Sequence, residues 1–491
     1  MPGPARPEAR PPVPDTSTRE SVPDAPEDQL KRSITGRLLF FYVLGDVLGS
    51  GIYVLIGAVA GAVGGAFWIA FAVGVSIATI TGLAYAELVT KYPRAAGAAL
   101  YVNKAFRNKA LTFLVTISFL SASFAASGSL ASGFAKYFAE VWDLPPALLV
   151  TILFVLVLSI VNYIGITESV VVNMLMTFVE VAGLVIIMGI GLWYVVEGNA
   201  HFGTLTEFTT EGNEIFAVVA GVALAFFAMT GFENAANVAE ETIAPKKTFP
   251  RALVGGMVAA GVIYVLVAMT AALTVDIPVL ADSDAALLEV VREGIIPVPV
   301  GVMTILFACI AMIAITNTTL VSVVTQSRIL YGMAREDVVP GVFAKIHPER
   351  RSPWVGLVFS FVVVAALLVV GDVIVRAGGE DVVSRLATVT VVFLLFIYAL
   401  VIVSALKLRG QDESEETFRA NTGLLLVGLV GNAVLLAYVV IDDPSSLYWV
   451  GGLLAIGVGL FVVEYLFGSR DRPAGRERGE PDPTDDLMKG A

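Results

Sequence analysis

The first long apolar segment of the chain, residues 37–62, is interrupted by the run Gly45-Asp46-Val47-Leu48-Gly49-Ser50-Gly51-Ile52-Tyr53. A bilayer offers the backbone no water, so a spanning helix keeps its N–H and C=O groups bonded within itself. Glycine weakens a helix, and a carboxylate is costly in lipid. The run therefore predicts a helix that breaks beside a water-filled cavity, an arrangement that can hold a small charged solute.

The composition places this interrupted segment in a polytopic membrane protein. The chain has 491 residues, of which 57% are hydrophobic and 15% charged. Its single Cys309 rules out an internal disulfide, and the two histidines leave little from which to build a zinc site or a catalytic triad. The absence of a Gly-Lys dipeptide excludes a P-loop, and the net charge of −12 argues against nucleic-acid binding. We expect neither an enzyme nor a metal or organic cofactor.

Twelve apolar segments follow one another between two polar tails. Most have the roughly 20 residues that span the hydrocarbon. The segments lie at 37–62, 67–90, 111–137, 146–165, 170–196, 214–239, 252–275, 296–332, 353–371, 383–406, 421–441 and 447–467. We therefore divide the chain into a disordered tail (1–35), a transmembrane domain (36–468) and a second disordered tail (469–491).

Loop charge predicts the orientation of the spans. With both tails on one side, that side holds all but four of the 31 Lys and Arg residues. The four on the other side are Lys136, Arg292, Arg376 and Arg385. Positive charge marks the cytoplasmic face, so both termini are expected in the cytoplasm of a multi-pass plasma-membrane protein.

A second interruption is predicted in the sixth segment, at Ala225-Phe226-Phe227-Ala228-Met229-Thr230-Gly231-Phe232-Glu233-Asn234. A glycine and polar groups again fall inside an apolar helix. The two interruptions lie five segments apart, the spacing that a five-plus-five inverted repeat gives. Direct likeness between the two halves is weak, so the repeat rests on this spacing.

The first interruption offers groups that suit an anion. Ser50 and the N–H groups around Gly49, Gly51 and Ile52 can meet a carboxylate at the positive end of a half-helix. The alternative is a packing face, since small residues let membrane helices approach closely. That alternative does not explain Asp46.

The second interruption offers groups that suit a cation. Carbonyls left unpaired around Thr230 and Gly231 can accept from an ammonium group. Three aromatic side chains could cover a solute or merely contact lipid and core: Phe226, Phe227 and Phe232. Phe227 precedes the break by one turn and is the preferred gate. Glu233 either bonds the broken backbone or senses protons.

Glu180 stands in the middle of the fifth segment, where a carboxylate must face the bundle interior with a partner or a proton. It is a candidate proton carrier, and Asp46 has a similar claim; the two could form one site. The alternative is a structural acid. Hydroxyls of residues 316–322 could bind sodium, although such groups more often bond their own helix. Arg328 could pair with Glu240 or Glu241 as an inner gate or as an ordinary ion pair.

At these residues the chain resembles the amino acid–polyamine–organocation (APC) superfamily of permeases. Four blocks between residues 37 and 467 carry the resemblance. They are residues 49–53 (GSGIY, where the family usually has GSGIF), 85–101 (YAEL through YPRAAGAALY), 226–251 (FFAMTGFE through EETIAPKKTFPR), and 328–337 (RILYGMARED) with Ser352-Pro353-Trp354.

The resemblance implies an all-α, LeuT-like fold of twelve helices with helices 1 and 6 unwound around the substrate. The carboxylate-binding backbone of the family maps to Ser50 and Gly51. The backbone that takes the amino group maps to Phe226, Met229 and Thr230. The gating aromatic maps to Phe227.

One position departs from the family pattern. Proton-coupled relatives often carry a lysine in helix 5, and the corresponding position here holds Glu180. A glutamate cannot replace a cation as a lysine ammonium can. Glu180 could instead carry the proton, hold a cation or bind a cationic substrate group.

We therefore expect a secondary transporter of an amino acid or related amine, working by alternating access. Proton coupling through Glu180 or Asp46 is the first expectation, exchange of two amines the second and sodium coupling the third. A cationic amino acid or polyamine carrier is the alternative within transport. A channel would need a continuous polar stripe, whereas the polar groups here cluster at two breaks. The sequence leaves the oligomeric state open.

Overall fold

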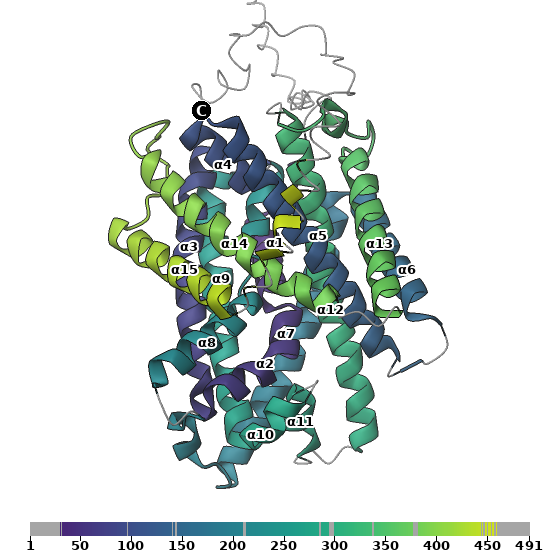
Figure 1. Ribbon diagram of the computed structural model, residues 1–491, viewed down its shortest axis with the longest axis vertical. Coiled ribbons are helices and arrows are strands. Elements are labelled where there is room, and N and C mark those ends of the chain that lie inside the picture. The colour runs from purple at the N-terminus through teal and green to yellow at the C-terminus, as the bar shows by residue number, and fades with distance from the viewer. Residues whose placement is uncertain are drawn as a thin grey trace, which may run out of the picture.

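The computed structural model is built from α-helices, with short 3-10 segments and a single isolated β-bridge among the described residues. Figure 1 shows the helices arranged as an elongated bundle. The structure describes residues 30–442 except 31, 96, 140, 143–144, 210–212, 284–285, 294–298, 336–337 and 377–381, and then only 444, 447–448, 450–452, 454–455 and 458.

The α-helices alternate with short connections along the chain. They are α1 Gly36–Leu48, α2 Ser50–Val63, α3 Trp68–Lys91, α4 Gly97–Phe106, α5 Lys109–Ala139, α6 Ala147–Ile164, α7 Ile166–Val196, α8 Glu214–Ala228, α9 Pro245–Thr274, α10 Ile277–Asp282, α11 Ala286–Arg292, α12 Val300–Arg335, α13 Trp354–Arg376, α14 Val382–Lys407 and α15 Thr422–Asp442. The 3-10 segments are η1 Gly65–Phe67, η2 Phe202–Thr206, η3 Phe232–Glu241 and η4 Gly341–Ala344.

Ten helices of the described chain are long and apolar enough to cross a membrane. The count is eleven if the bent stretch from Gly36 to Val63, which contains α1 and α2, forms one span. The axes of its two parts, Gly36–Tyr53 and Leu55–Val63, differ by 63°. The structure is thus the all-helical, multi-pass protein that the sequence predicts. Most of the twelfth expected segment, residues 447–467, lies outside the described residues, so a total of twelve spans stays a prediction.

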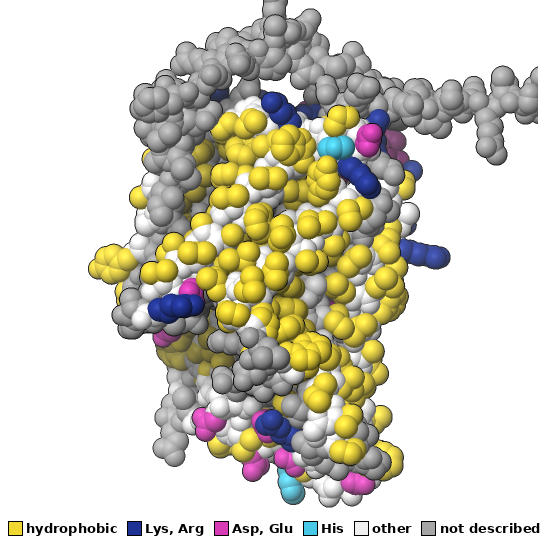
Figure 2. All heavy atoms as spheres, turned by 90° about the vertical axis from the view of Figure 1, so that its right-hand side faces the viewer, with side chains coloured by type: hydrophobic (Ala, Val, Ile, Leu, Met, Phe, Trp, Pro, Cys, Tyr) yellow, Lys and Arg dark blue, Asp and Glu magenta, His cyan; other side chains and the backbone are white. Residues whose placement is uncertain are grey.

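Large apolar side chains face outward along the middle of the bundle. Figure 2 shows hydrophobic side chains covering this band on one face, with most of the charged side chains nearer the two ends and a few at its left and right edges. Leu192 on α7, Val362 on α13 and Val430 on α15 are each more than half exposed. An apolar band between charged ends is the surface that a bilayer requires.

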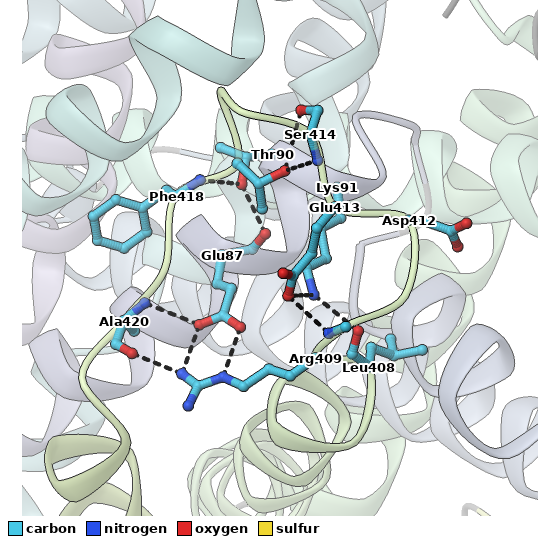
Figure 3. Close-up of polar contacts among 12 residues, drawn as sticks. Glu87, Thr90, Lys91, Leu408, Arg409, Asp412, Glu413, Ser414, Phe418 and Ala420 are labelled. Atoms are coloured by element: carbon cyan, nitrogen blue, oxygen red, sulfur yellow. Dashed lines mark hydrogen bonds and ion pairs between the residues drawn. The ribbon is translucent and has the colours of Figure 1, made fainter. Parts of the chain in front are cut away.

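Polar contacts hold one end of the bundle together next to the helices that surround the breaks. At the end of α3, the buried Glu87 accepts from Arg409 Nε at 3.0 Å and Nη2 at 2.9 Å, and from the Ala420 N–H at 2.9 Å (Figure 3). Lys91 donates to the Leu408 carbonyl at 2.9 Å and pairs with Glu413. These contacts fasten the α14–α15 loop to α3, and so fix one end of α14.

The residues just before α1 pack against the end of η3. Ser33 and Ile34 donate their N–H groups to the Glu241 carbonyl, and Ile243 donates back to the Ile34 carbonyl at 2.8 Å. Leu30 and Ile34, within the range assigned to the N-terminal tail, are buried. The described bundle therefore includes these residues as well as α1. Residues 1–29 and 469–491 of the expected tails lie outside the described residues.

Candidate functional site

The first apolar segment is helical on both sides of one glycine. The helix α1 ends at Leu48, Gly49 leaves helical geometry with ψ −158°, and α2 begins at Ser50. Neighbouring atoms leave no room for side chains here: a Cβ on Gly49 would lie 1.9 Å from Thr318 Oγ1. A Cβ on Gly51 would lie 2.5 Å from the Ala228 Cα, at the end of α8. The glycines therefore also serve the close packing that we weighed as an alternative.

The sixth segment loses its α-helical geometry at Met229–Gly231, between α8 and η3. Gly231 has φ +118°, a conformation that glycine adopts without strain. A Cβ at this position would meet the Asp46 carboxyl carbon at 2.9 Å. Glu233 Oε2 accepts from the Gly231 N–H at 2.9 Å. Glu233 thus bonds the interrupted backbone, as one of our two expectations stated.

Asp46 links the two interruptions. Its side chain is buried, and Oδ2 accepts from Asn234 Nδ2 at 2.8 Å, across 188 residues of sequence. Its other oxygen, Oδ1, has no hydrogen-bond partner in the described part of the protein. A buried carboxylate oxygen without a donor is costly, because its desolvation is uncompensated. The atom is therefore a ready acceptor for a cationic group.

Helix α14 supplies a partner that sequence reasoning missed. The Tyr398 hydroxyl donates to Glu233 Oε2 at 2.6 Å, across 165 residues. Phe226 is fully buried, with its ring 6.1 Å from that of Tyr398. No local signal marks Tyr398, which sits in an ordinary apolar segment. Its contact depends on where α14 lies relative to η3.

A cavity lies between the two interruptions. The cavity has a volume of about 50 Å³, several times the roughly 10–15 Å³ that one water needs. Its lining residues are Asp46, Val47, Gly49, Gly51, Phe119, Ala122, Ser123, Ala126, Leu130, Phe227, Ala228, Thr230, Gly231, Glu233, Asn234, Thr318, Ser322, Thr390 and Leu394. Together these come from α1, α2, α5, α8, η3, α12 and α14 and from the interruptions themselves.

Most of the residues predicted to bind substrate line this cavity. The lining members are Asp46, Gly49, Gly51, Phe227, Thr230 and Gly231. Glu233, which we predicted for coupling or for bonding the broken backbone, lines it as well. Phe226 and Met229 are buried beside them without lining the cavity. The side chain of Ser50 lies outside the described part of the structure, although its backbone begins α2. The sequence did not indicate Phe119, Ser123 and Thr390.

Glu180 belongs to a second buried polar cluster. Its Oε2 accepts from Asn317 Nδ2 at 3.3 Å, and Asn173 Nδ2 donates to Asn317 Oδ1 at 2.6 Å. Its Oε1 has no hydrogen-bond partner among the described residues. Asp46 and Glu180 thus have separate partners, Asn234 and Asn317, rather than sharing one hydrogen-bond cluster as we considered.

Three of the hydroxyls that could bind sodium are bonded within their own helix. Thr316, Thr318 and Thr319 donate to the carbonyls four residues earlier on α12. This is the backbone bonding typical of membrane helices. The described residues also contain no group of three or more His, Cys, Asp or Glu side chains placed to hold a metal ion.

Arg328 pairs with one of the two acids that we named. Its Nε lies 3.3 Å from Glu241 Oε2, and both side chains are fully buried. Glu240 pairs instead with Arg335, at 2.8 Å. The Arg328–Glu241 pair lies outside the cavity lining, at the end of η3 that the residues before α1 cover.

Apolar helices long enough to span a membrane surround a small cavity whose largely apolar lining includes two carboxylates, an arrangement typical of a multi-pass membrane transporter. Residues 36–464 match the family model described as amino acid permease. The chain therefore belongs to the amino acid permease family of the APC superfamily, as its motifs indicated. It is a transporter rather than an enzyme.

Two relatives illustrate the range of this family. The chain is 26% identical over 359 residues to cationic amino acid transporter 9, chloroplastic, of Arabidopsis thaliana, covering 68% of this chain and 61% of that protein. It is 25% identical over 362 residues to the branched-chain amino acid permease BcaP of Bacillus subtilis, covering 70% of this chain and 75% of that protein. The chain thus spans about three fifths of the plant relative.

A solved transporter shares the fold. Mhp1, a nucleobase-cation-symport-1 family transporter in a closed conformation with bromovinylhydantoin bound, superposes with a TM-score of 0.55. The match covers 87% of this chain and 96% of Mhp1 at 15% identity. At that identity the likeness concerns the fold alone.

Proposed function

We propose that this transporter carries amino acids or related amines by secondary active transport, and that it binds them in the cavity between its two interrupted spans. One observation carries the proposal above all. The buried Asp46 Oδ1, which has no hydrogen-bond partner among the described residues, belongs to a residue that lines a cavity bounded by two half-helix ends. A bound ammonium group would compensate this oxygen.

The two ends of an amino acid find complementary groups in the cavity. The N-terminus of α2, at Ser50–Ile52, favours the substrate carboxylate through its N–H groups and helix dipole. The carbonyls of Phe226 and Phe227 already accept from the N–H groups of Met229 and Thr230. We therefore assign the main share of amine binding to Asp46 rather than to these carbonyls.

Phe227 lines the cavity and is partly exposed to it, so we assign it the gating role. Alternating access would bring this aromatic ring over a bound solute and separate the solute from water. We assign the buried Arg328–Glu241 pair to the opposite gate, since it lies at the end of η3.

Coupling is proposed to run through protons, with Glu180 as the first carrier and Asp46 and Glu233 as further candidates. The support is burial: Glu180 is fully buried and has one oxygen without a partner in the described structure. Exchange of two amines is the second possibility. Sodium coupling is the third possibility.

A cationic amino acid or polyamine substrate is the second candidate, and one observation favours it. Two carboxylates, Asp46 and Glu233, line the cavity, whereas no Lys, Arg or His is among the described lining residues. Such an imbalance suits a substrate with a net positive charge.

Uptake into proteoliposomes tests both candidates. Radiolabelled leucine, arginine and putrescine are compared, with and without an inward proton gradient. We expect saturable uptake that shows counterflow when unlabelled substrate is loaded inside. Preference for arginine or putrescine over leucine favours the cationic candidate. Linear, non-saturable flux of all three would refute a carrier and favour a channel.

The proposal also includes the number of membrane spans and their orientation. We infer twelve spans in a five-plus-five inverted repeat, with both termini in the cytoplasm and the protein in the plasma membrane. The bias of Lys and Arg to one side supports this orientation. Labelling of cysteines introduced at Lys247 and at Glu289, in a protein whose own Cys309 is replaced by serine, tests it. A membrane-impermeant thiol reagent should reach position 289 in intact cells, and position 247 only after permeabilisation.

A further inference from the structure

Tyr264 touches both interruptions from a helix that is itself unbroken. It lies near the middle of α9 and is fully buried. Its hydroxyl reaches the Val47 carbonyl in the last turn of α1, and it lies 3.0 Å from the Ala228 carbonyl at the end of α8. The same hydroxyl therefore contacts the last turn of each half-helix that ends at a break.

These two carbonyls need donors because of the breaks. In a continuous helix a carbonyl accepts from the N–H four residues later, and the final turn lacks such donors. For Val47 and Ala228 those donors would be Gly51 and Phe232, which lie beyond the interruptions in α2 and η3. Buried carbonyls are almost always satisfied, so a side-chain donor is expected at such a position.

We propose that Tyr264 is a positioning residue for substrate binding, because its hydroxyl ties the two half-helix ends together and sets the width of the cavity between them. The proposal rests on the proposed function of that cavity. Val47 and Ala228 themselves line the cavity, so a shift of either half-helix end changes its shape.

The hydrogen bond of the Tyr264 hydroxyl can also shift from the end of α1 to the end of α8. A tyrosine hydroxyl carries one proton, which the Val47 and Ala228 carbonyls share in this structure and which either carbonyl can accept alone. When α1 moves away during transport, the hydroxyl can stay with Ala228 and keep its hydrogen bond. Tyr264 therefore holds the site in shape without locking the two half-helices together permanently.

Packing fixes the ring of Tyr264 independently of its hydroxyl. The ring lies edge-on to Phe71 of α3, with centroids 5.9 Å apart. The helix α9 packs extensively against α1 and α3. Tyr264→Phe keeps this ring and loses only the donor, so we expect it to fold and insert normally.

The chain offers a matched control at Tyr101 on α4. Its ring is also fully buried and lies edge-on to another ring, that of Tyr85, at 6.2 Å. Its hydroxyl has no hydrogen-bond partner among the described residues. Tyr101→Phe therefore removes the same atom from a similar environment without removing a tie.

The experiment measures KM and maximal rate in proteoliposomes for whichever of leucine, arginine and putrescine the wild type takes up. We expect Tyr264→Phe to raise KM about tenfold with a maximal rate within twofold of the wild type, and Tyr101→Phe to change neither. Equal KM values for Tyr264→Phe and wild type would overturn the proposal. Failure of the wild type to take up any of the three would instead refute the proposed function.

A second variant keeps the test decisive if Tyr264→Phe fails to fold. Site-specific incorporation of 4-aminophenylalanine at position 264 places an amine, with two N–H donors, between the two carbonyls. We expect its KM to equal or fall below that of the wild type. A tenfold rise in KM for this donor-bearing variant would show that the donor does not position the site, and would overturn the proposal.

Discussion

Replacing Gly51 with alanine should push the two interrupted spans apart at the cavity. The new Cβ would lie 2.5 Å from the Ala228 Cα and 2.7 Å from its Cβ, whereas ordinary contacts begin at 3.4 Å. Because the opposing atoms include backbone, the half-helices must separate by about 0.9 Å. A misplacement of about 1 Å in a positioned site can cost roughly 100-fold in rate.

The fold should survive this substitution. Overpacking costs about 1–3 kcal/mol. Unfolding entropy of roughly 2.1 cal/mol/K per residue, applied to the residues between the two expected tails, converts this cost into a fall in melting temperature of about 1–3 °C. The prediction is a folded protein whose uptake, measured at a substrate concentration well below KM, falls by ten- to a hundredfold.

Gly128→Ala on α5 is the matched control. A Cβ there meets nothing within 4 Å among the described atoms, so uptake and melting temperature should match the wild type. Initial rates in proteoliposomes and melting curves of the purified proteins give both readouts. Uptake by Gly51→Ala within twofold of the wild type would refute the claim that the closeness of these spans shapes the site.

Three further predictions concern charged groups. Glu180→Gln should abolish uptake driven by a proton gradient but spare substrate exchange; unchanged pH-driven uptake would end the coupling proposal. Glu87→Gln removes the acid of the Glu87–Arg409 pair in Figure 3, which should cost about 2–4 kcal/mol of stability and lower the melting temperature by about 2–4 °C. Glu416→Gln, which removes the acid of the solvent-exposed pair with Lys247, is the control and should leave the melting temperature unchanged. The hydrogen bond from the Gly410 N–H lowers the pKa of Glu413 in the folded protein. The ionised Glu413 side chain therefore stabilises the fold above about pH 4.3, and this stabilisation is lost as the pH falls through the lower pKa of the folded state. Between pH 5 and pH 3 the melting temperature should fall less in Glu413→Gln than in the wild type.

The class of protein, and several residues that line the cavity, could be predicted because they depend on local sequence. Glycines inside an apolar run conflict with an unbroken spanning helix, and a buried acid needs a reason to be there. Gly49, Gly231 and Asp46 therefore stood out against their neighbours, and they line the cavity. The permease motifs around these residues identified the family.

The partners of these residues could not be predicted, because they come from distant parts of the chain. Asn234, Tyr398 and Tyr264 reach their acceptors across 188, 165 and 217 residues. A tyrosine inside an apolar span looks the same in sequence whether it faces lipid, core or cavity. Both surroundings of a membrane helix are apolar, so hydrophobic periodicity does not reveal which face packs inward.

The sequence also could not show that Asp46 and Glu180 have different hydrogen-bond partners. Both are lone acids in apolar segments, which made a shared site attractive. The structure gives each an amide partner of its own, Asn234 and Asn317, from different helices. Gly45, next to Asp46, abuts Asn317, so the two clusters are neighbours along α1 without merging.

A cryo-electron microscopy map of the protein with bound substrate, at a resolution that shows side chains, would reveal whether the substrate binds between the two interrupted spans. Samples would contain saturating arginine or leucine, whichever the protein transports. We expect density between the two interruptions, with the substrate amine within hydrogen-bond distance of Asp46 Oδ1 and its carboxylate at the start of α2. Substrate density elsewhere, with Asp46 contacting no part of it, would rule out this cavity as the binding site.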